Sequence, residues 1–143
     1  MSVEDDNKAV LQRIYDEVFN AGKIEVIDEI VSPDVVEHEE MPGLSADREG
    51  VKQFMRAIRE AFPDLHVAPQ DVIASGDRVV ARIRLTGTQR GEFAGIPPTN
   101  KPVDVETIDI VRFEGGRIAE HWGITDQLRM MQQLGVIPEE PAP

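Results

Sequence analysis

Residues 103–125 read VDVETIDIVRFEGGRIAEHWGIT, and this stretch decides the fold. Apolar and polar residues alternate on both sides of Glu114-Gly115-Gly116. Such a period of two is typical of strands that bury one face. The stretch therefore predicts two antiparallel strands, Val103–Phe113 and Arg117–Thr125, joined by a tight turn.

Upstream of this hairpin, Arg78–Thr88 alternates in the same way, and residues 65–74 are strand-like with a proline that indicates an edge or a bulge. A further short strand is expected at residues 34–38. Ser75-Gly76-Asp77 is expected to be a turn and Phe93–Pro102 a loop with three prolines. The order of the strands predicts a long antiparallel meander.

The first third of the chain has a helical period instead, with apolar residues spaced three and four apart. A glycine or proline follows each such stretch, which marks its end. Three helices are expected here, and Asp126 is a suitable N-cap for a fourth. The predicted stretches are Val3–Phe19, Ile24–Val31, Arg48–Phe62 and residues 127–134.

The composition narrows the function classes. The chain has 143 residues, no cysteine and a net charge of −12, which disfavours thiol chemistry and nucleic-acid binding. No apolar run approaches the ~20 residues of a membrane span, so no membrane partner is expected. We expect a cytoplasmic protein of one domain, residues 1–143, with a loose tail at 136–143.

Helices segregated from strands indicate the α+β class. We expect a cone in which a strongly bent antiparallel sheet wraps around the N-terminal helices and leaves an internal pocket. The apolar stripes are core first, but Tyr15, Phe54, Met55 and Ile58 are candidates for lining that pocket.

His121 is the strongest of three histidines as a functional residue. A two-residue turn would place Ile110 opposite His121, whereas a three-residue loop with a bulge would place Asp109 there. We favour the second register, because it also pairs Val111 with Ala119 and Thr107 with Gly123 and so gives a coherent face. An aspartate directly opposite a histidine can orient the imidazole and favour its protonated form. A buried structural pair is the alternative.

Glu37 and His38 lie at the end of the expected short strand, where they could meet the rim of the pocket or form an acidic surface loop. No helical His-x-x-x-His pattern is present, so no metal is expected. Serine chemistry lacks a Gly-x-Ser-x-Gly elbow.

Four blocks in order resemble the SnoaL-like polyketide cyclases, or ester cyclases, of the NTF2-like superfamily. They are Phe62–Leu65, Gly91–Thr99, Arg112–Trp122, and Asp126 with Gln133–Gly135. The resemblance implies a curved antiparallel sheet, an apolar pocket, a homodimer formed through the sheet, and an intramolecular aldol ring closure that needs no cofactor or metal.

The resemblance also bears on single residues. His121 matches the histidine of the last strand, but Gly123 stands where these cyclases carry their acid/base aspartate. Asp109 stands at a pocket histidine, and Glu37 at a pocket asparagine. The family's catalytic set is therefore replaced by a different polar set.

We expect a cofactor-independent enzyme that moves a proton next to the carbonyl of a small apolar compound, with His121 and Asp109 as catalytic residues. Glu37, His38 and the four apolar or aromatic candidates would bind the substrate. Cyclase, isomerase, dehydratase or hydrolase chemistry fits. The alternatives are a non-catalytic module that binds a small molecule, and a dimeric scaffold with a filled interior; Trp122 would anchor a dimer.

Overall fold

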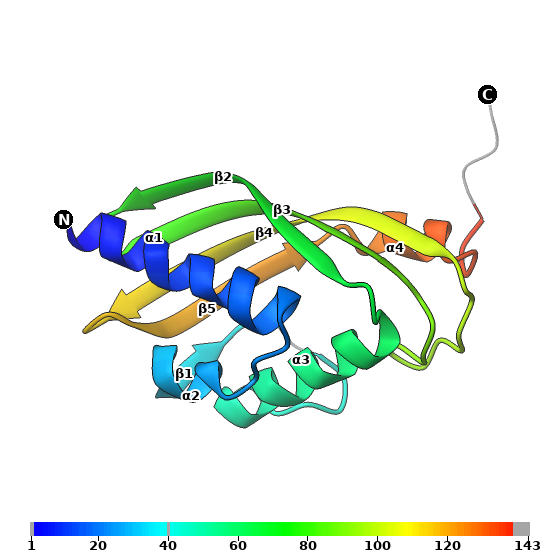
Figure 1. The fold of residues 1–143 in the computed structure, drawn as a ribbon, viewed down its shortest axis with the longest axis horizontal. Helices are drawn as coiled ribbons and strands as arrows, with labels where there is room; N and C mark the ends of the chain where they lie inside the picture. Colours follow the sequence, from blue (N-terminus) through cyan, green and yellow to red (C-terminus); the bar gives the residue numbers. More distant parts are fainter. Residues whose placement is uncertain (1, 40, 139–143) are drawn as a thin grey trace.

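The computed structural model describes residues 2–39 and 41–138. It is an α+β fold in which helices lie along one face of a curved five-stranded sheet (Figure 1). The strand order is β1-β5-β4-β3-β2. The strands are β1 (Val31–Glu37), β2 (His66–Ser75), β3 (Arg78–Thr88), β4 (Pro102–Glu114) and β5 (Arg117–Thr125).

The four C-terminal strands form the predicted meander, and alternation along β3 and β4 gives it one buried and one open face. The predicted irregularity in β2 is present, since its register with β3 shifts between Pro69 and Asp71. The sheet is not purely antiparallel as expected, because β1 pairs with β5 in parallel. Its five strands therefore form a mixed sheet.

The helical layer follows the predicted order. The elements are α1 (Val3–Arg13), the π-helix η1 (Ile14–Asn20), α2 (Val26–Ile30), α3 (Arg48–Ala61) and α4 (Gln127–Gln133). Side chains of Ser2, Asp47 and Asp126 accept a hydrogen bond from the first turn of α1, α3 and α4. The second helix ends one residue earlier than predicted, and β1 begins at Val31, so Ser32-Pro33 lies inside the strand.

The register of the β4–β5 hairpin differs from both sequence-based alternatives. Gly115 and Gly116 form a two-residue turn, and both have positive φ (57° and 79°), as a turn of this kind requires. A bulge at Ala119 then shifts the pairing by one residue. As a result, Val111 lies opposite His121 and Asp109 lies opposite Gly123, so the predicted Asp109–His121 cross-strand pair is wrong.

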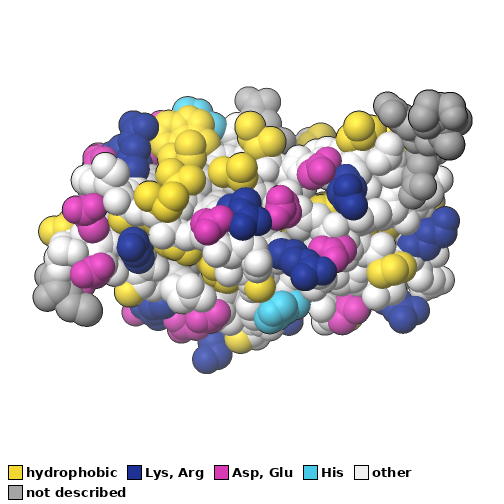
Figure 2. Space-filling model, turned by 90° about the horizontal axis from the view of Figure 1, so that it is seen from above, with side chains coloured by type: hydrophobic (Ala, Val, Ile, Leu, Met, Phe, Trp, Pro, Cys, Tyr) yellow, Lys and Arg dark blue, Asp and Glu magenta, His cyan; other side chains and the backbone are white. Residues whose placement is uncertain are grey.

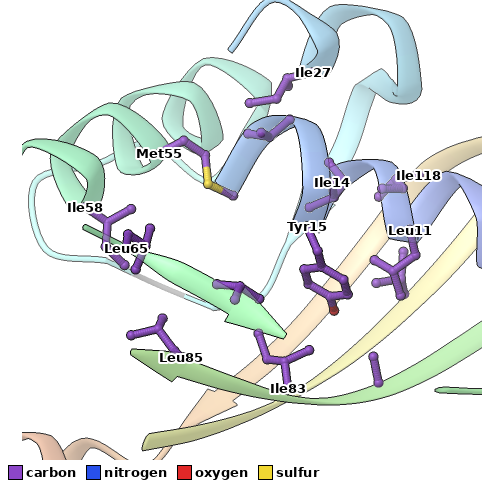
Figure 3. Packing of buried hydrophobic residues seen from close by; sticks show 14 of the residues in the cluster. Leu11, Ile14, Tyr15, Ile27, Met55, Ile58, Leu65, Ile83, Leu85 and Ile118 are labelled. Carbon is purple, nitrogen blue, oxygen red and sulfur yellow. The ribbon is translucent and has the colours of Figure 1, made fainter. Parts of the chain in front are cut away.

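The core lies between the helical layer and the buried face of the sheet. Figure 3 shows Tyr15 pointing from η1 toward Ile83 on β3, while Met55 and Ile58 extend from α3. Tyr15 and Ile83 are 1% and 2% exposed. These side chains pack between the helices and the sheet, and a cavity lies beside them.

The loop between β3 and β4 is fixed to the end of α3. Phe62 is fully buried and meets Phe93 edge to face, with ring centroids 5.5 Å apart. The backbone amides of Arg90 and Gly91 both donate to the carbonyl of Ala61. Inside the loop, the buried side chain of Gln89 bonds to Ile96 and Thr99.

Within the described residues, every helix is too short or too polar to cross a membrane. The predicted loose tail at 136–143 falls mostly outside the described residues, since 139–143 are not described.

Candidate functional site

An apolar cavity of about 290 Å³ lies between the sheet and the helices α1, η1 and α3. Tyr15, Phe54, Met55 and Ile58 all line it, as the sequence predicts. No lysine or arginine is among the lining residues in the described part of the chain, whereas Glu37, Glu39, Asp109 and His121 are. The cavity is therefore apolar over most of its wall, with one group of ionisable side chains.

Tyr15 connects the helical layer to this group. It lies in the π-helical turn of η1, a conformation that often occurs at functional sites. Its hydroxyl donates a hydrogen bond of 2.8 Å to Asp109 Oδ2. Burial raises the pKa of Tyr15 well above its ordinary value, and the Asp109 charge adds to the shift, so the hydroxyl stays a donor.

His121 lies at the centre of the group and bridges two strands. Its Nε2 is 2.8 Å from Asp109 Oδ1 on β4, and its Nδ1 is 2.7 Å from Glu37 Oε1 on β1. The parallel pairing of β1 with β5 places Glu37 beside His121. Both carboxylates are acceptors, so the imidazole can satisfy both only by donating from both nitrogens.

The electrostatics agree with that hydrogen-bond pattern. Burial by itself lowers the pKa of His121, but the hydrogen bonds and negative charges of Asp109 and Glu37 outweigh it and raise the pKa to about 10. His121 is therefore an imidazolium at neutral pH. A permanent cation at the wall of an apolar cavity can stabilise negative charge that develops on a ligand.

Gly123 explains how Asp109 reaches His121 although the two are not directly paired. Asp109 and His121 point to the same face as diagonal neighbours, and the residue opposite Asp109 has no side chain. A Cβ at Gly123 would lie 2.9 Å from His121 Cε1 and 3.0 Å from Asp109 Oδ1, and it would collide with Glu39 Oε2. A side chain at position 123 would therefore displace these three side chains from their present positions.

Glu39 is the site residue that the sequence analysis missed. It follows β1 and lines the cavity together with Glu37. Burial raises the pKa of the Glu39 carboxyl; His121 opposes this shift, and the charges of Asp109 and Glu37 reinforce it. A period of two puts residues 37 and 39 on the same face, but which face meets the cavity depends on the pairing of β1 with β5.

His38 does not lie at the pocket rim, where it was predicted. His38 directly follows β1 and lies on the side of the sheet opposite Glu37, where its ring stacks on Trp122 with centroids 4.9 Å apart. Its Nε2 is 2.6 Å from Glu120 Oε2. His38 therefore belongs to the outer surface.

One subset of the group has the spacing of a metal site. One ligand atom from each of Glu37, Glu39 and His121 lies within 4.8 Å of the others. Coordination needs a free lone pair on the imidazole, and both His121 nitrogens are held by carboxylates. The arrangement is better matched to a protonated histidine between carboxylates than to a metal.

A family comparison agrees with this fold and pocket. The model of the SnoaL-like polyketide cyclases matches residues 9–134. The aklanonic acid methyl ester cyclase DnrD of Streptomyces peucetius is 29% identical over 125 residues, which cover 83% of this chain and 84% of that protein.

Solved structures give the same result. TsrD from Streptomyces laurentii superposes with a TM-score of 0.87 at 26% identity, over 96% of this chain and 100% of that chain. A protein from Jannaschia sp. CCS1, described as a SnoaL-like polyketide cyclase, superposes with a TM-score of 0.84 at 30% identity, over 96% and 97% of the two chains. The sequence match, the α+β fold and the cavity agree: this chain belongs to the SnoaL-like polyketide cyclase family.

Proposed function

We propose that this protein closes a ring in a small, mostly apolar carbonyl compound by an intramolecular aldol reaction, using acid/base catalysis and no cofactor. The observation that carries the proposal is the charged His121, held between Asp109 and Glu37 at the wall of an apolar cavity. A relative of this chain is described as an aklanonic acid methyl ester cyclase, which supports a methyl ester of a polyketide acid as the substrate class. A cytoplasmic location remains part of the proposal.

The chemistry begins with removal of a proton from the carbon next to a carbonyl. The electron pair of the C–H bond moves to the carbonyl oxygen, and the positive charge of His121 stabilises the resulting enolate. The enolate carbon then attacks a second carbonyl of the same molecule and forms the new C–C bond. The oxygen of that carbonyl takes up a proton, so substrate and product have the same atoms.

Asp109 and Tyr15 have positioning roles in this scheme. Asp109 accepts from His121 and from the Tyr15 hydroxyl, so it fixes the ring and balances its charge. Glu37 holds the other ring nitrogen and contacts the polar end of the substrate. Tyr15, Phe54, Met55 and Ile58 supply the apolar wall that binds the carbon skeleton.

Asp109→Asn is expected to lower kcat for ring closure of aklanonic acid methyl ester about 100-fold. The amide keeps the size of the side chain but removes the charge that holds His121 protonated. Turnover is followed by chromatography of the closed product, with Asp77→Asn in the exposed β2–β3 turn as the matched control.

Unchanged turnover in Asp109→Asn would contradict the proposed mechanism. The non-catalytic binding module makes a different prediction: the wild-type protein would be stabilised by the ester in a thermal-shift assay and would form no product. The comparisons favour a cyclase-related function over that alternative.

We also propose that two copies associate through the outer face of the sheet. Ile73, Ile108 and Ile124 are 64%, 49% and 78% exposed there. Seen from the side on which β2 lies, hydrophobic side chains gather beside a histidine, and basic and acidic side chains alternate next to them (Figure 2). Exposed apolar side chains on one face of a sheet are typical of an interaction surface.

Ile124→Glu is expected to convert a dimer into a monomer, because a carboxylate at that position would be buried without a partner at the interface. Size-exclusion chromatography with light scattering at micromolar concentration checks this. Val3→Glu, at a residue 68% exposed on α1, is the matched control and should leave the dimer intact. A wild-type protein that is already monomeric would overturn the proposal.

A further inference from the structure

We propose that Glu39 is the general base that removes the proton from the substrate carbon. This inference rests on the proposed function and adds the identity of the proton acceptor. It follows from which ionisable groups of the cavity are already engaged, and from the space above Gly123.

The other ionisable groups at the cavity are engaged with one another. His121 carries its proton at neutral pH and has no lone pair to accept another. Asp109 accepts from both His121 and Tyr15. Glu37 accepts at Oε1 from His121 and from the backbone amide of Glu39. The oxygens of Asp109 and Glu37 that face the site therefore already have donors, and neither carboxylate is free for the substrate proton.

Glu39 differs from these groups. Among the described residues no donor is placed on its carboxylate, and its backbone amide is what bonds to Glu37. The carboxylate faces the cavity and lies within 4.8 Å of the ligand atoms of Glu37 and His121. A base with an unbonded oxygen beside a fixed cation is in place to take a proton while the cation stabilises the enolate.

The pKa of Glu39 suits this role. Burial raises it above its ordinary value, toward the pH at which the enzyme works, and a base is most effective when the two are close. Three charged groups face Glu39: His121 on β5, Asp109 on β4 and Glu37 on β1. The first lowers the pKa and the other two raise it.

The carboxylate of Glu39 lies directly beside the backbone of Gly123. The Glu39 Oε2 atom lies so close above the Gly123 backbone that even a Cβ would displace it. The carboxylate of Glu39 thus fills the space that a side chain at position 123 would take. The carboxyl group in this space therefore comes from Glu39, on the segment after β1, and not from position 123 on β5.

The step balances without another reactant. Glu39 takes the proton as the C–H bond breaks, and the electron pair enters the enolate. After the new C–C bond forms, the negative charge lies on the second carbonyl oxygen. Glu39 returns the proton to that oxygen and regains its charge, so the cycle consumes no acid, oxidant or reductant.

The test compares Glu39→Gln with Glu92→Gln, which changes an exposed loop glutamate. Two readouts use aklanonic acid methyl ester: ring closure, and deuterium uptake at the carbon next to the carbonyl in D₂O. Glu39→Gln should lower kcat and deuterium uptake about 100-fold or more, with KM and Tm close to those of the wild type. The acidic limb of the pH–rate profile should also disappear.

A second experiment tests whether a carboxylate in this space is sufficient when it comes from another position in the chain. Glu39→Ala vacates the space above Gly123, and Gly123→Asp in the same chain returns a carboxylate to it. The double variant is expected to recover at least about 10-fold in deuterium uptake over Glu39→Ala alone. Gly123→Asp alone should be impaired, because its side chain collides with Glu39.

The outcomes are distinct. If the Glu39→Gln variant is as active as the wild type, Glu39 is not the general base, and the proposed function still stands. Wild-type protein that neither closes the ring nor exchanges the proton overturns the proposed function and this inference together. Loss of wild-type exchange on treatment with EDTA would assign Glu37, Glu39 and His121 to a metal, and would also overturn the inference.

Discussion

Replacing His121 with alanine is expected to lower kcat for ring closure by about 1,000-fold, the largest effect on catalysis of any single substitution in this chain. The change removes the cation that stabilises the enolate, and it leaves the carboxylates of Asp109 and Glu37 facing one another without a shared donor. The measurement is single-turnover ring closure of the ester substrate, with Tm recorded to show that the variant folds.

The pH dependence of the wild type gives an independent check. The folded-state pKa of His121 is about 10, above the ordinary value of 6.5. Its contribution to stability and to charge stabilisation is therefore complete below pH 6.5 and is lost as the pH rises through about 10. Activity should fall over that alkaline range in the wild type, and the fall should be missing in His121→Gln. A wild-type profile that shows no fall as the pH rises through about 10 would contradict the imidazolium.

Phe62→Ala is expected to cost about 3–5 kcal/mol of unfolding free energy. Phe62 is fully buried at the end of α3, and its ring packs against Phe93. Gly87 lies against it so closely that a Cβ there would be 3.2 Å from Phe62 Cβ. Truncation therefore leaves a cavity that neither neighbour can fill, and it frees the loop between β3 and β4.

Phe54→Ala is the matched control for this prediction. Phe54 lines the existing cavity and is only partly buried, so its truncation enlarges a space that is already there. Its cost should be about 1–2 kcal/mol, below the range for full burial of an aromatic ring. Urea denaturation followed by circular dichroism measures both losses. Equal losses in the two variants would show that Phe62 does not anchor the loop.

The sequence predicts the secondary structure of this chain well where one period dominates. The strands at Arg78–Thr88 and Arg117–Thr125 have the bounds that alternation predicts. The hairpin register could not be predicted, because it depends on a bulge at Ala119. Both Ile118 and Ala119 are buried, and adjacent buried residues carry no period-two signal that would mark which one is extra.

The site was predictable in part for the same reason. His121 and Asp109 do meet, but through the absence of a side chain at Gly123 and not through direct pairing. Glu39 and His38 were misjudged because the direction of β1 and its parallel partner are set by tertiary packing. Once β1 is paired with β5, alternation assigns Glu37 to the cavity and His38 to the outer face.

The parallel pairing of β1 with β5 also determines the stage of folding at which the site can form. Tyr15 and Asp109 are 94 residues apart in the chain, and Glu37 and His121 are 84 apart. Contacts over such separations carry a large loop-closure entropy and are made late in folding. The strand that completes the sheet is also the strand that brings His121. A chain that lacks β5 lacks both His121 and the strand that joins β1 to the rest of the sheet. Maturation of the fold and assembly of the proton-transfer group are therefore a single event.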